Sequence, residues 1–407
     1  MENFVARQAI FNRNLKVFAY ELLFRSGQEN VYVATDADKA TSSVITDSFL
    51  TIGLESLTRG KRAFINFTKN LLMDETAAIL PKDSLVIEIL EDIIPDEGII
   101  AACTKLKENG YTLALDDFVF DEVFEPLIKL ADIIKVDFRL SGLEEGRALI
   151  EKYGLEKIKF LAEKVETQDE FDQALGMGYT YFQGYFFSKP VIVASKDIPG
   201  YKINHINIIH EVNRPDVNFN RIENIIKQDV TISYKLLKFI NSAFFSFSSK
   251  IQSIKQALVM LGIDEFRKWV SIVVLKGMGD DKPDELMVIS IVRAKFCEFI
   301  AEIIGLKKRG PELFFMGMFS VIDTFMGRPM EEILGNLPLE DDIKDALSGS
   351  EGRLRNVYEL MLANEKGEWD KIFEYADKLG IDKSKIPGIY VKALESANEI
   401  FTSLPSQ

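Results

Sequence analysis

Cysteine and histidine are scarce in this chain of 407 residues. It has two cysteines, Cys103 and Cys297, and two histidines, His205 and His210. The cysteines are far apart and lack CxxC spacing, so we expect neither a disulfide framework nor a cysteine metal cluster, which fits a reducing cytoplasm. The histidines are five residues apart, which is not the i, i+4 spacing of two metal ligands on one helix face. We therefore expect a structural or surface role for both.

Long apolar runs and excess positive charge are also missing. The segments Trp269 to Leu275 and Met287 to Val292 are shorter than the roughly 20 residues that span a bilayer. The first residues, MENFVARQAIF, lack a basic region followed by a long apolar run, so we expect no signal peptide and a cytoplasmic protein without a membrane partner. The formal charge of -14 argues against DNA as a partner, although a local site can still hold one small anion.

The first half of the chain alternates strand-like and helix-like segments. A turn-forming cluster, Asn12-Arg13-Asn14, separates the first two strand-like runs and predicts an antiparallel hairpin. The predicted strands are Val5 to Phe11, Val17 to Phe24, Ala63 to Phe67, Leu85 to Leu90, Thr112 to Phe118, Ile133 to Phe138, Lys159 to Val165 and Tyr179 to Phe186. The predicted helices are Ala40 to Leu57, Gly98 to Asn109, Phe124 to Ala131, Gly142 to Tyr153 and Thr167 to Leu175, the last closing on Gly176. Eight strands within roughly 200 residues favour a (β/α)8 barrel over a doubly wound sheet, with one strand of the hairpin running against the others.

Polar side chains stand at or near the ends of seven of these strands. In chain order they are Glu21, Asn66, Glu88 with Glu91, Asp116 with Asp117, Lys135 with Asp137, Glu163 with Glu166, and Gln183. Each alone suits an exposed loop residue, but the carboxyl ends of barrel strands meet at one mouth. Carboxylate and amide oxygens are the ligands of Mg²⁺ or Mn²⁺, and two such ions can activate water against a phosphodiester. Lys135 could orient or deprotonate that water, or neutralise developing charge.

These motifs resemble the EAL domains, which hydrolyse or bind the bacterial second messenger cyclic di-GMP. The similarity covers residues 1 to about 195 and is carried by YELLFR at 20–25, FINF, IEILE, LALDDF, IKVD at 134–137, LAEKVE at 161–166 and QGYFFSKP at 183–190. It implies a βα barrel with an antiparallel first strand. The implied metal ligands are Glu21, Asn66, Glu88, Asp116 and Asp117, with Lys135 and Glu163 supporting a metal-bound water that Gln183 holds in place. Arg25 would contact a ligand phosphate.

The sequence departs from the family pattern in three places. The acid of the signature triplet is followed by two leucines, and Lys164 stands where the family usually has glycine. After Phe118 the chain reads Val119 to Val123, where the family has a glycine and a serine-rich turn that couples metal binding to dimerisation and turnover. Because glycine permits backbone conformations that valine resists, we expect the ligands to be kept and the turnover to be weak or absent.

From residue 203 onward the pattern is helical. The segment Ala194 to Lys202 reads as a linker, which predicts a barrel over residues 1–197 and a helical bundle over 198–407. The predicted helices are Phe219 to Ile226, Ile232 to Ile240, Ile254 to Leu261, Asp264 to Leu275, Glu285 to Ile304 and Glu312 to Phe325. We expect Asp264 to cap a new helix after Gly262, and Phe244, Phe245 and Phe247 to be core residues.

This second half resembles the HDOD domain, a helical output module related to the HD phosphohydrolases. The likeness rests on DVTIS at 229–233, LLKFINSAFF at 236–245 and IQSIKQALVMLGIDEFRKW at 251–269. The hydrolase chemistry of those relatives needs several histidines and a His-Asp pair, which this half lacks. We therefore expect it to bind a signalling protein.

Three hypotheses follow for the whole chain. The favoured one is a cyclic di-GMP receptor with weak or no phosphodiesterase activity, whose helical half passes the signal to a protein. The others are an active Mg²⁺- or Mn²⁺-dependent cyclic di-GMP phosphodiesterase and a silent scaffold. A homodimer is possible in each case.

Overall fold

The computed structural model describes most of the chain. The described residues are 3–26, 54–74, 77, 80–116, 121–139, 142–154, 157–189, 200–214, 218–247, 250–279, 282–335, 337 and 339–405. By their internal contacts the residues form two compact units, one of Met1–Phe187 with Asn364–Trp369 and one of Ser188–Ala363 with Asp370–Gln407. Among the described residues, no helix is long and apolar enough to cross a membrane.

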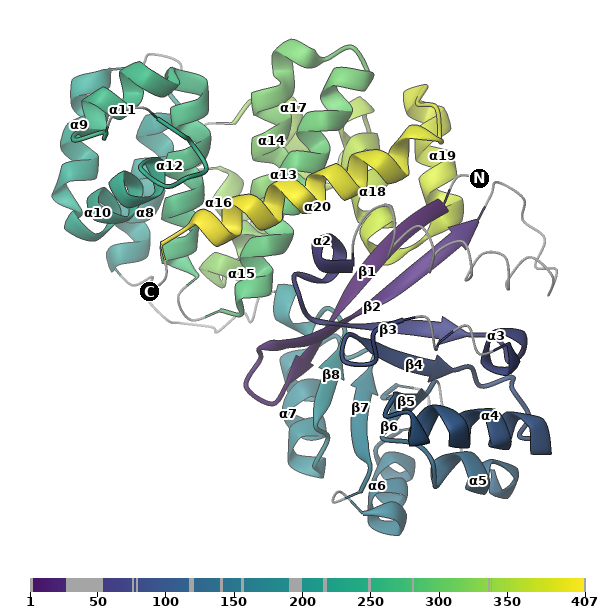
Figure 1. Cartoon of the computed structure of the whole chain (residues 1–407). Helices are drawn as coiled ribbons and strands as arrows, with labels where there is room; N and C mark the ends of the chain where they lie inside the picture. The colour runs from purple at the N-terminus through teal and green to yellow at the C-terminus, as the bar shows by residue number, and fades with distance from the viewer. Residues whose placement is uncertain are drawn as a thin grey trace. The chain divides into compact units, whose positions relative to one another are not determined.

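The first unit contains a closed barrel of eight strands in sequence order (Figure 1). The strands are β1 Asn3–Asn12, β2 Val17–Ser26, β3 Arg62–Phe67, β4 Leu85–Ile89, β5 Thr112–Leu115, β6 Ile133–Asp137, β7 Lys159–Glu163 and β8 Tyr181–Gln183. β1 pairs antiparallel with both β2 and β8, and the other neighbouring pairs are parallel. The prediction of a (β/α)8 barrel with an antiparallel first strand is therefore confirmed.

Turn chemistry explains why β1 reverses into β2. The side chain of Asn12 accepts hydrogen bonds from the backbone N–H groups of Asn14 and Lys16 at 2.9 and 3.1 Å. Leu15 adopts a positive φ of 56°, which turns the chain sharply. An asparagine that bonds to the backbone two and four residues ahead fixes a tight turn, as the sequence predicts.

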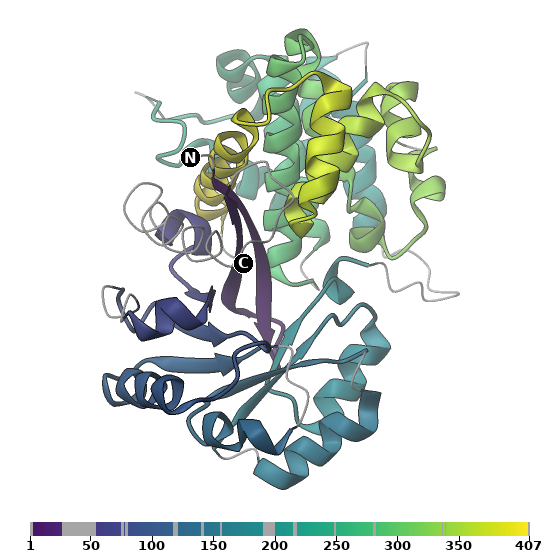
Figure 2. The same cartoon turned by 90° about the vertical axis from the view of Figure 1, so that its right-hand side faces the viewer.

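Helices surround the barrel strands on the outside (Figure 2). They are α2 Leu54–Thr58, α3 Lys69–Met73, α4 Glu97–Glu108, α5 Glu125–Ile128, α6 Gly142–Tyr153 and α7 Gln168–Met177. α3 is not among the predicted helices, and most of the predicted helix at 40–57 lies outside the described residues. The predicted end of α7 at Gly176 is wrong, because the left-handed cap is Gly178, with a φ of 104°.

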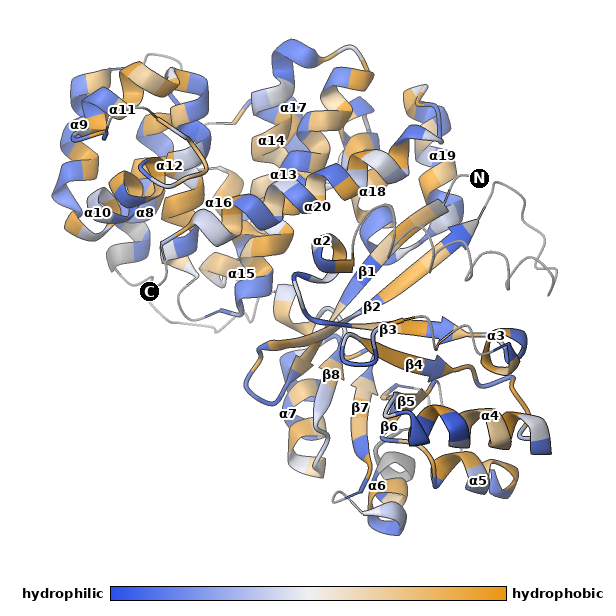
Figure 3. Ribbon diagram, in the orientation of Figure 1, coloured by the Kyte–Doolittle hydropathy of each residue, from blue (hydrophilic) through white to orange (hydrophobic). Residues whose placement is uncertain are grey.

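The barrel interior is built in layers. Seven strands each contribute one buried apolar side chain to the lower layer: Ile10, Ala19, Phe64, Val86, Ala114, Ile133 and Leu161. Strands β3, β4 and β7 are accordingly mostly orange in Figure 3. Burial of a Val, Leu, Ile or Phe side chain contributes roughly 1.5–3 kcal/mol to folding, so the five larger side chains of this layer form a stable apolar floor under the residues above it.

The described residues of the second unit form helices and the turns and loops between them, without a strand. Its helices are α8 Gly200–Val212, α9 Phe219–Gln228, α10 Val230–Ile240, α11 Ile254–Leu261, α12 Ile263–Met278, α13 Asp284–Ile303, α14 Gly310–Phe319, α15 Ile322–Met326, α16 Met330–Leu334, α17 Asp341–Ser348, α18 Arg353–Lys366, α19 Trp369–Leu379 and α20 Lys385–Ser403, of which α18 and α19 extend into the short stretch assigned to the first unit. α8 begins inside the predicted linker.

Two predictions for the helical half are wrong in detail. The stretch from 312 to 325 is two helices, because α14 ends at Phe319 and α15 begins at Ile322. Gly262, not Asp264, is the N-cap of α12; it has a φ of 77°, and Asp264 lies in the first turn. An acidic residue in a first turn still stabilises the helix through the positive end of its dipole.

Candidate functional site

A polar layer lies directly above the apolar floor of the barrel. On five strands, and directly after the end of β5, a polar residue follows the floor residue by two positions, so both point inward. These residues are Glu21 after Ala19, Asn66 after Phe64, Glu88 after Val86, Asp116 after Ala114, Lys135 after Ile133 and Glu163 after Leu161. The strands thus bring together six of the residues predicted for the site, and Gln183 on β8 joins them through Glu21.

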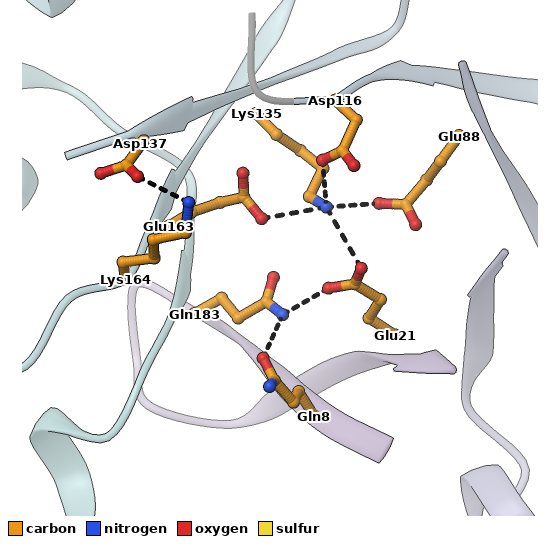
Figure 4. Close-up of polar contacts among 9 residues, drawn as sticks. All are labelled: Gln8, Glu21, Glu88, Asp116, Lys135, Asp137, Glu163, Lys164 and Gln183. Atoms are coloured by element: carbon orange, nitrogen blue, oxygen red, sulfur yellow. Dashed lines mark hydrogen bonds and ion pairs between the residues drawn. The ribbon is translucent and has the colours of Figure 1, made fainter. Parts of the chain in front are cut away.

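Lys135 is the centre of this layer (Figure 4). Its Nζ lies 2.6 Å from Asp116 Oδ1, 2.7 Å from Glu88 Oε1, 2.9 Å from Glu163 Oε1 and 3.6 Å from Glu21 Oε1. The Lys135 side chain is only 1% exposed. The contact to Glu88 is an ion pair by distance without hydrogen-bond geometry. One ammonium group therefore serves four carboxylates.

Burial and charge act on these groups in opposite directions. Burial alone would lower the pKa of Lys135, but the carboxylates around it raise that pKa well above its ordinary value. Burial raises the pKa of Glu88 well above its ordinary value although Lys135 opposes this, and it raises the pKa of Glu163 to about 8. In this arrangement Lys135 is a cation, which fits charge neutralisation better than proton abstraction.

A second set of contacts includes a residue that the sequence reasoning missed. Gln183 Nε2 donates to Glu21 Oε2 at 2.5 Å and to Gln8 Oε1 at 2.9 Å. Gln8 lies opposite Glu21 in the β1–β2 ladder and precedes the floor residue Ile10 by two positions. On β1 the polar residue precedes the floor residue by two positions instead of following it, because β1 is antiparallel to its neighbours. Gln8 can therefore be identified only when the direction of the strand is taken into account.

Several oxygen atoms of the polar layer have no hydrogen-bond partner. They are Asn66 Oδ1, Glu88 Oε1 and Oε2, Glu163 Oε2 and Gln183 Oε1, all buried, and the statement covers the described residues. Buried acceptors without a donor are costly, and the exceptions commonly mark a site for an ion or water. A hard divalent cation requires this type of ligand. The residues present therefore fit Mg²⁺ or Mn²⁺. In this structure the Lys135 ammonium occupies the position on which the carboxylates converge. Among the described residues, no group of three or more acidic, histidine or cysteine side chains is arranged to hold a metal ion.

The other residues predicted near the site have different positions. Asp117 lies outside the described residues. Arg25 is half-buried on β2 and is four residues beyond Glu21, which is roughly 13 Å along a strand. Glu91 is exposed after β4, and Glu166 forms an ion pair with Arg139 at 2.8 Å. Neither Glu91 nor Glu166 contacts Lys135.

A tight turn after β8 holds the end of the polar layer. Gly184 has a φ of 145°, and a Cβ atom there would lie 1.9 Å from the carbonyl oxygen of Val165. The backbone N–H of Val165 donates to the carbonyl of Gln183 at 3.0 Å. Only glycine fits this approach, so the QG dipeptide places Gln183 by backbone packing.

In the helical unit the two histidines have different surroundings. His205 is buried, with its Nε2 3.5 Å from Asp229 Oδ2, whereas the His210 side chain is 42% exposed. Phe244, Phe245 and Phe247 are half-buried rather than fully buried. Phe244 and Phe245 pack edge-on against Trp269, with ring centroids 5.2 and 5.4 Å away. This aromatic cluster closes the end of α10 by packing.

Comparisons with known proteins agree with both halves. The family model of the EAL domain matches residues 47–190, and that of the HDOD domain matches residues 201–326. The chain is 40% identical to the uncharacterized protein YuxH of Bacillus subtilis over 97% of this chain and 98% of that one. It is 36% identical to the cyclic di-GMP phosphodiesterase CdgJ of Vibrio cholerae over 98% of this chain and 93% of that one. A manganese and cyclic di-GMP complex of BlrP1 from Klebsiella pneumoniae matches with 24% identity and a TM-score of 0.37, over 46% of this chain and 55% of that one.

Fold and site together define a βα-barrel protein with an acidic, oxygen-rich centre joined to a helical module. The chain belongs to the family of bacterial signalling proteins in which an EAL domain precedes an HDOD domain. Both resemblances drawn from the sequence motifs are thereby confirmed.

Proposed function

We propose that the barrel binds cyclic di-GMP together with Mg²⁺ or Mn²⁺ and hydrolyses one of its phosphodiester bonds, and we place this function before the receptor that the sequence alone favours. The observation that carries this proposal is the group of buried oxygen atoms without hydrogen-bond partners in the polar layer. They belong to Asn66, Glu88, Glu163 and Gln183, and two of these residues, Glu88 and Glu163, also contact Lys135. The similarity to CdgJ, named a cyclic di-GMP phosphodiesterase, supports the same substrate.

In this proposal each residue of the layer has its own task. Glu21, Asn66, Glu88, Asp116 and Asp117 would hold the cations. Bound there, divalent ions would supply an activated water and stabilise charge on the leaving oxygen. Lys135, at the centre of the layer, would neutralise negative charge, and Glu163 and Gln183 would orient the water. Arg25 would bind a phosphate further along β2.

A second candidate function is a receptor that binds cyclic di-GMP without efficient turnover. Its support is the sequence from Val119 to Val123, where a glycine and a serine-rich turn are usual in the EAL domains that the chain resembles. Valine in place of glycine restricts the backbone that such a turn needs. The two candidates share the binding residues and differ only in the rate of hydrolysis.

The helical unit is proposed to bind a signalling protein. Five exposed large apolar side chains lie on three neighbouring helices of this unit: Phe219 on α9, Val230 and Tyr234 on α10, and Val259 and Met260 on α11. Exposed apolar side chains that gather on one face commonly mark an interaction surface, and these five would form one. Domain limits of 1–197 and 198–407, and a homodimer, stay predictions.

One experiment separates the three functions proposed for the chain. Calorimetry with cyclic di-GMP and Mn²⁺ measures binding, and chromatography of the same samples detects the linear product. Steady formation of product supports the phosphodiesterase, and binding without product supports the receptor. If the chain neither binds nor hydrolyses cyclic di-GMP, the scaffold is the remaining function. Glu21→Ala should abolish the metal-dependent heat. Glu91→Ala, which changes an exposed acid outside the layer, serves as the control.

A further inference from the structure

A second lysine lies beside the polar layer. Lys164 directly follows Glu163 at the end of β7, and its Nζ lies 2.6 Å from Asp137 Oδ2 (Figure 4). Asp137 ends β6 and is only 5% exposed. In the parallel β6–β7 ladder Asp137 and Glu163 are direct partners. Two buried carboxylates therefore stand side by side. Glu163 shares Lys135 with three other carboxylates, whereas Asp137 pairs with Lys164, whose side chain is 52% exposed.

The ion pair between Lys164 and Asp137 limits the repulsion between the Asp137 and Glu163 carboxylates. Glu163 Oε1 lies 2.9 Å from Lys135 Nζ, and Lys135 precedes Asp137 by two residues on the inner face of β6. Asp137 Oδ1 accepts a hydrogen bond from the backbone N–H of Arg139 at 2.9 Å, so Lys164 supplies the positive charge on the other oxygen, Oδ2. Without Lys164 the Asp137 carboxylate would lose this ion pair next to Glu163. Like charges at this spacing repel, so Glu163 would turn away or Asp137 would compete for Lys135.

The backbone gives a second, independent observation. Lys164 has a φ of +55°, a left-handed conformation that is uncommon for any residue other than glycine. Glycine would adopt it without strain, yet the chain has a lysine here whose ammonium reaches back to β6. A strained turn held by an ion pair fixes the peptide that immediately follows Glu163.

We propose that Lys164, through its ion pair with Asp137, is a positioning residue that keeps Glu163 in contact with Lys135. The inference rests on the proposed function in one respect, because Glu163 matters for turnover only if the barrel hydrolyses cyclic di-GMP. The ion pair itself, and the place of Glu163, can be tested without any nucleotide.

The test uses three variants of the full chain. Lys164→Met removes the charge and keeps the length, Lys164→Gly removes the charge and also relieves the backbone, and Lys164→Arg keeps the charge. We expect the Met and Gly variants each to lower kcat for cyclic di-GMP by about tenfold with little change in KM, and the Arg variant to recover most of the loss. Lys159→Met, at the exposed start of the same strand, is the matched control.

Two outcomes would overturn the inference. If Lys164→Gly keeps the wild-type kcat while Lys164→Met loses it, the backbone rather than the ion pair is responsible. The second readout is a crystal structure of metal-free Lys164→Met. We expect Glu163 Oε1 to have moved away from Lys135 Nζ in that structure, and an unchanged contact would contradict the proposal. This readout still decides the question if the wild-type protein neither binds nor hydrolyses cyclic di-GMP, a result that would refute the proposed function alone.

Discussion

Lys135 and Glu88 form a fully buried ion pair in the barrel, with Nζ 2.7 Å from Oε1 and side chains 1% and 0% exposed. Three further carboxylates, those of Glu21, Asp116 and Glu163, contact the same ammonium. Taking charges out of water is costly, and it is tolerated only where the partners remain. The layer thus carries more negative than positive charge and depends on its single central cation.

Removing that cation should destabilise the fold. We expect Lys135→Met to lower the free energy of unfolding by about 3–5 kcal/mol in EDTA, because it leaves buried carboxylates uncompensated. Urea denaturation followed by circular dichroism measures the change. Lys129→Met is the control, since that side chain is 70% exposed and should change stability by less than about 0.5 kcal/mol. A Lys135→Met protein as stable as the wild type would show that the carboxylates tolerate one another without the ammonium.

Divalent metal should stabilise the folded chain. An ion that binds only the folded state raises the free energy of unfolding by about 2.7 kcal/mol at a concentration of 100 times its Kd. We expect Mn²⁺ to raise the melting temperature over that in EDTA. Glu21→Ala should remove most of this rise, and Glu91→Ala should retain it. If Mn²⁺ does not change the melting temperature of the wild type, the proposed metal site is contradicted.

The helical unit offers a stability change that depends on pH. Glu298 on α13 contacts Lys268 Nζ at 2.5 Å and Lys295 Nζ at 2.6 Å. Burial alone would raise the pKa of Glu298, but the two lysines together lower it below its ordinary value. A carboxyl whose pKa is lower in the folded than in the unfolded state stabilises the protein above the unfolded pKa of about 4.3, and this stabilisation is lost as the pH falls through the folded pKa.

Glu298→Gln should therefore be less stable than the wild type at pH 7, and the difference should shrink as the pH falls below about 4. Urea denaturation at several pH values measures both effects. Glu302→Gln on the same helix is the control, because its side chain is 54% exposed and lies 3.4 Å from Lys307. A difference that stays constant from pH 7 to pH 3 would mean that lost packing, not lost charge, destabilises the variant.

Gly184 should be intolerant of any side chain. In Gly184→Ala the new Cβ would lie 1.9 Å from the Val165 carbonyl, so the turn and Gln183 must move. We expect a loss of several kcal/mol, against about 1–2 kcal/mol for Gly154→Ala, where φ is +72° and no atom lies within 4 Å of the new Cβ. Denaturation of both variants compares the two. Equal losses would mean that backbone conformation alone, without the close approach, sets the cost at Gly184.

The sequence predicts the barrel well because the strands alternate with period two and glycines and asparagines mark their ends. The same alternation identifies most of the polar layer, since Glu88 and Glu163 each follow an inward-facing apolar residue by two. Glu91 and Glu166 come three residues later, so they fall off the inner face. Gln8 was missed although the antiparallel direction of β1 was predicted, because on a reversed strand the polar residue precedes the floor residue instead of following it at the strand end. The break between α14 and α15 was missed because both helices are mostly apolar.

The pairing of β1 with β8 also determines when the site can exist during folding. Ile10 lies opposite Gln183 across that seam, and the Glu21–Gln183 hydrogen bond joins residues 162 positions apart. Contacts between such distant residues require a long loop to close first, so they form late and slow the folding of barrels. A nascent chain that ends before β8 has the acids of the layer but not the amide that joins them, so closing the barrel and completing the site are one event.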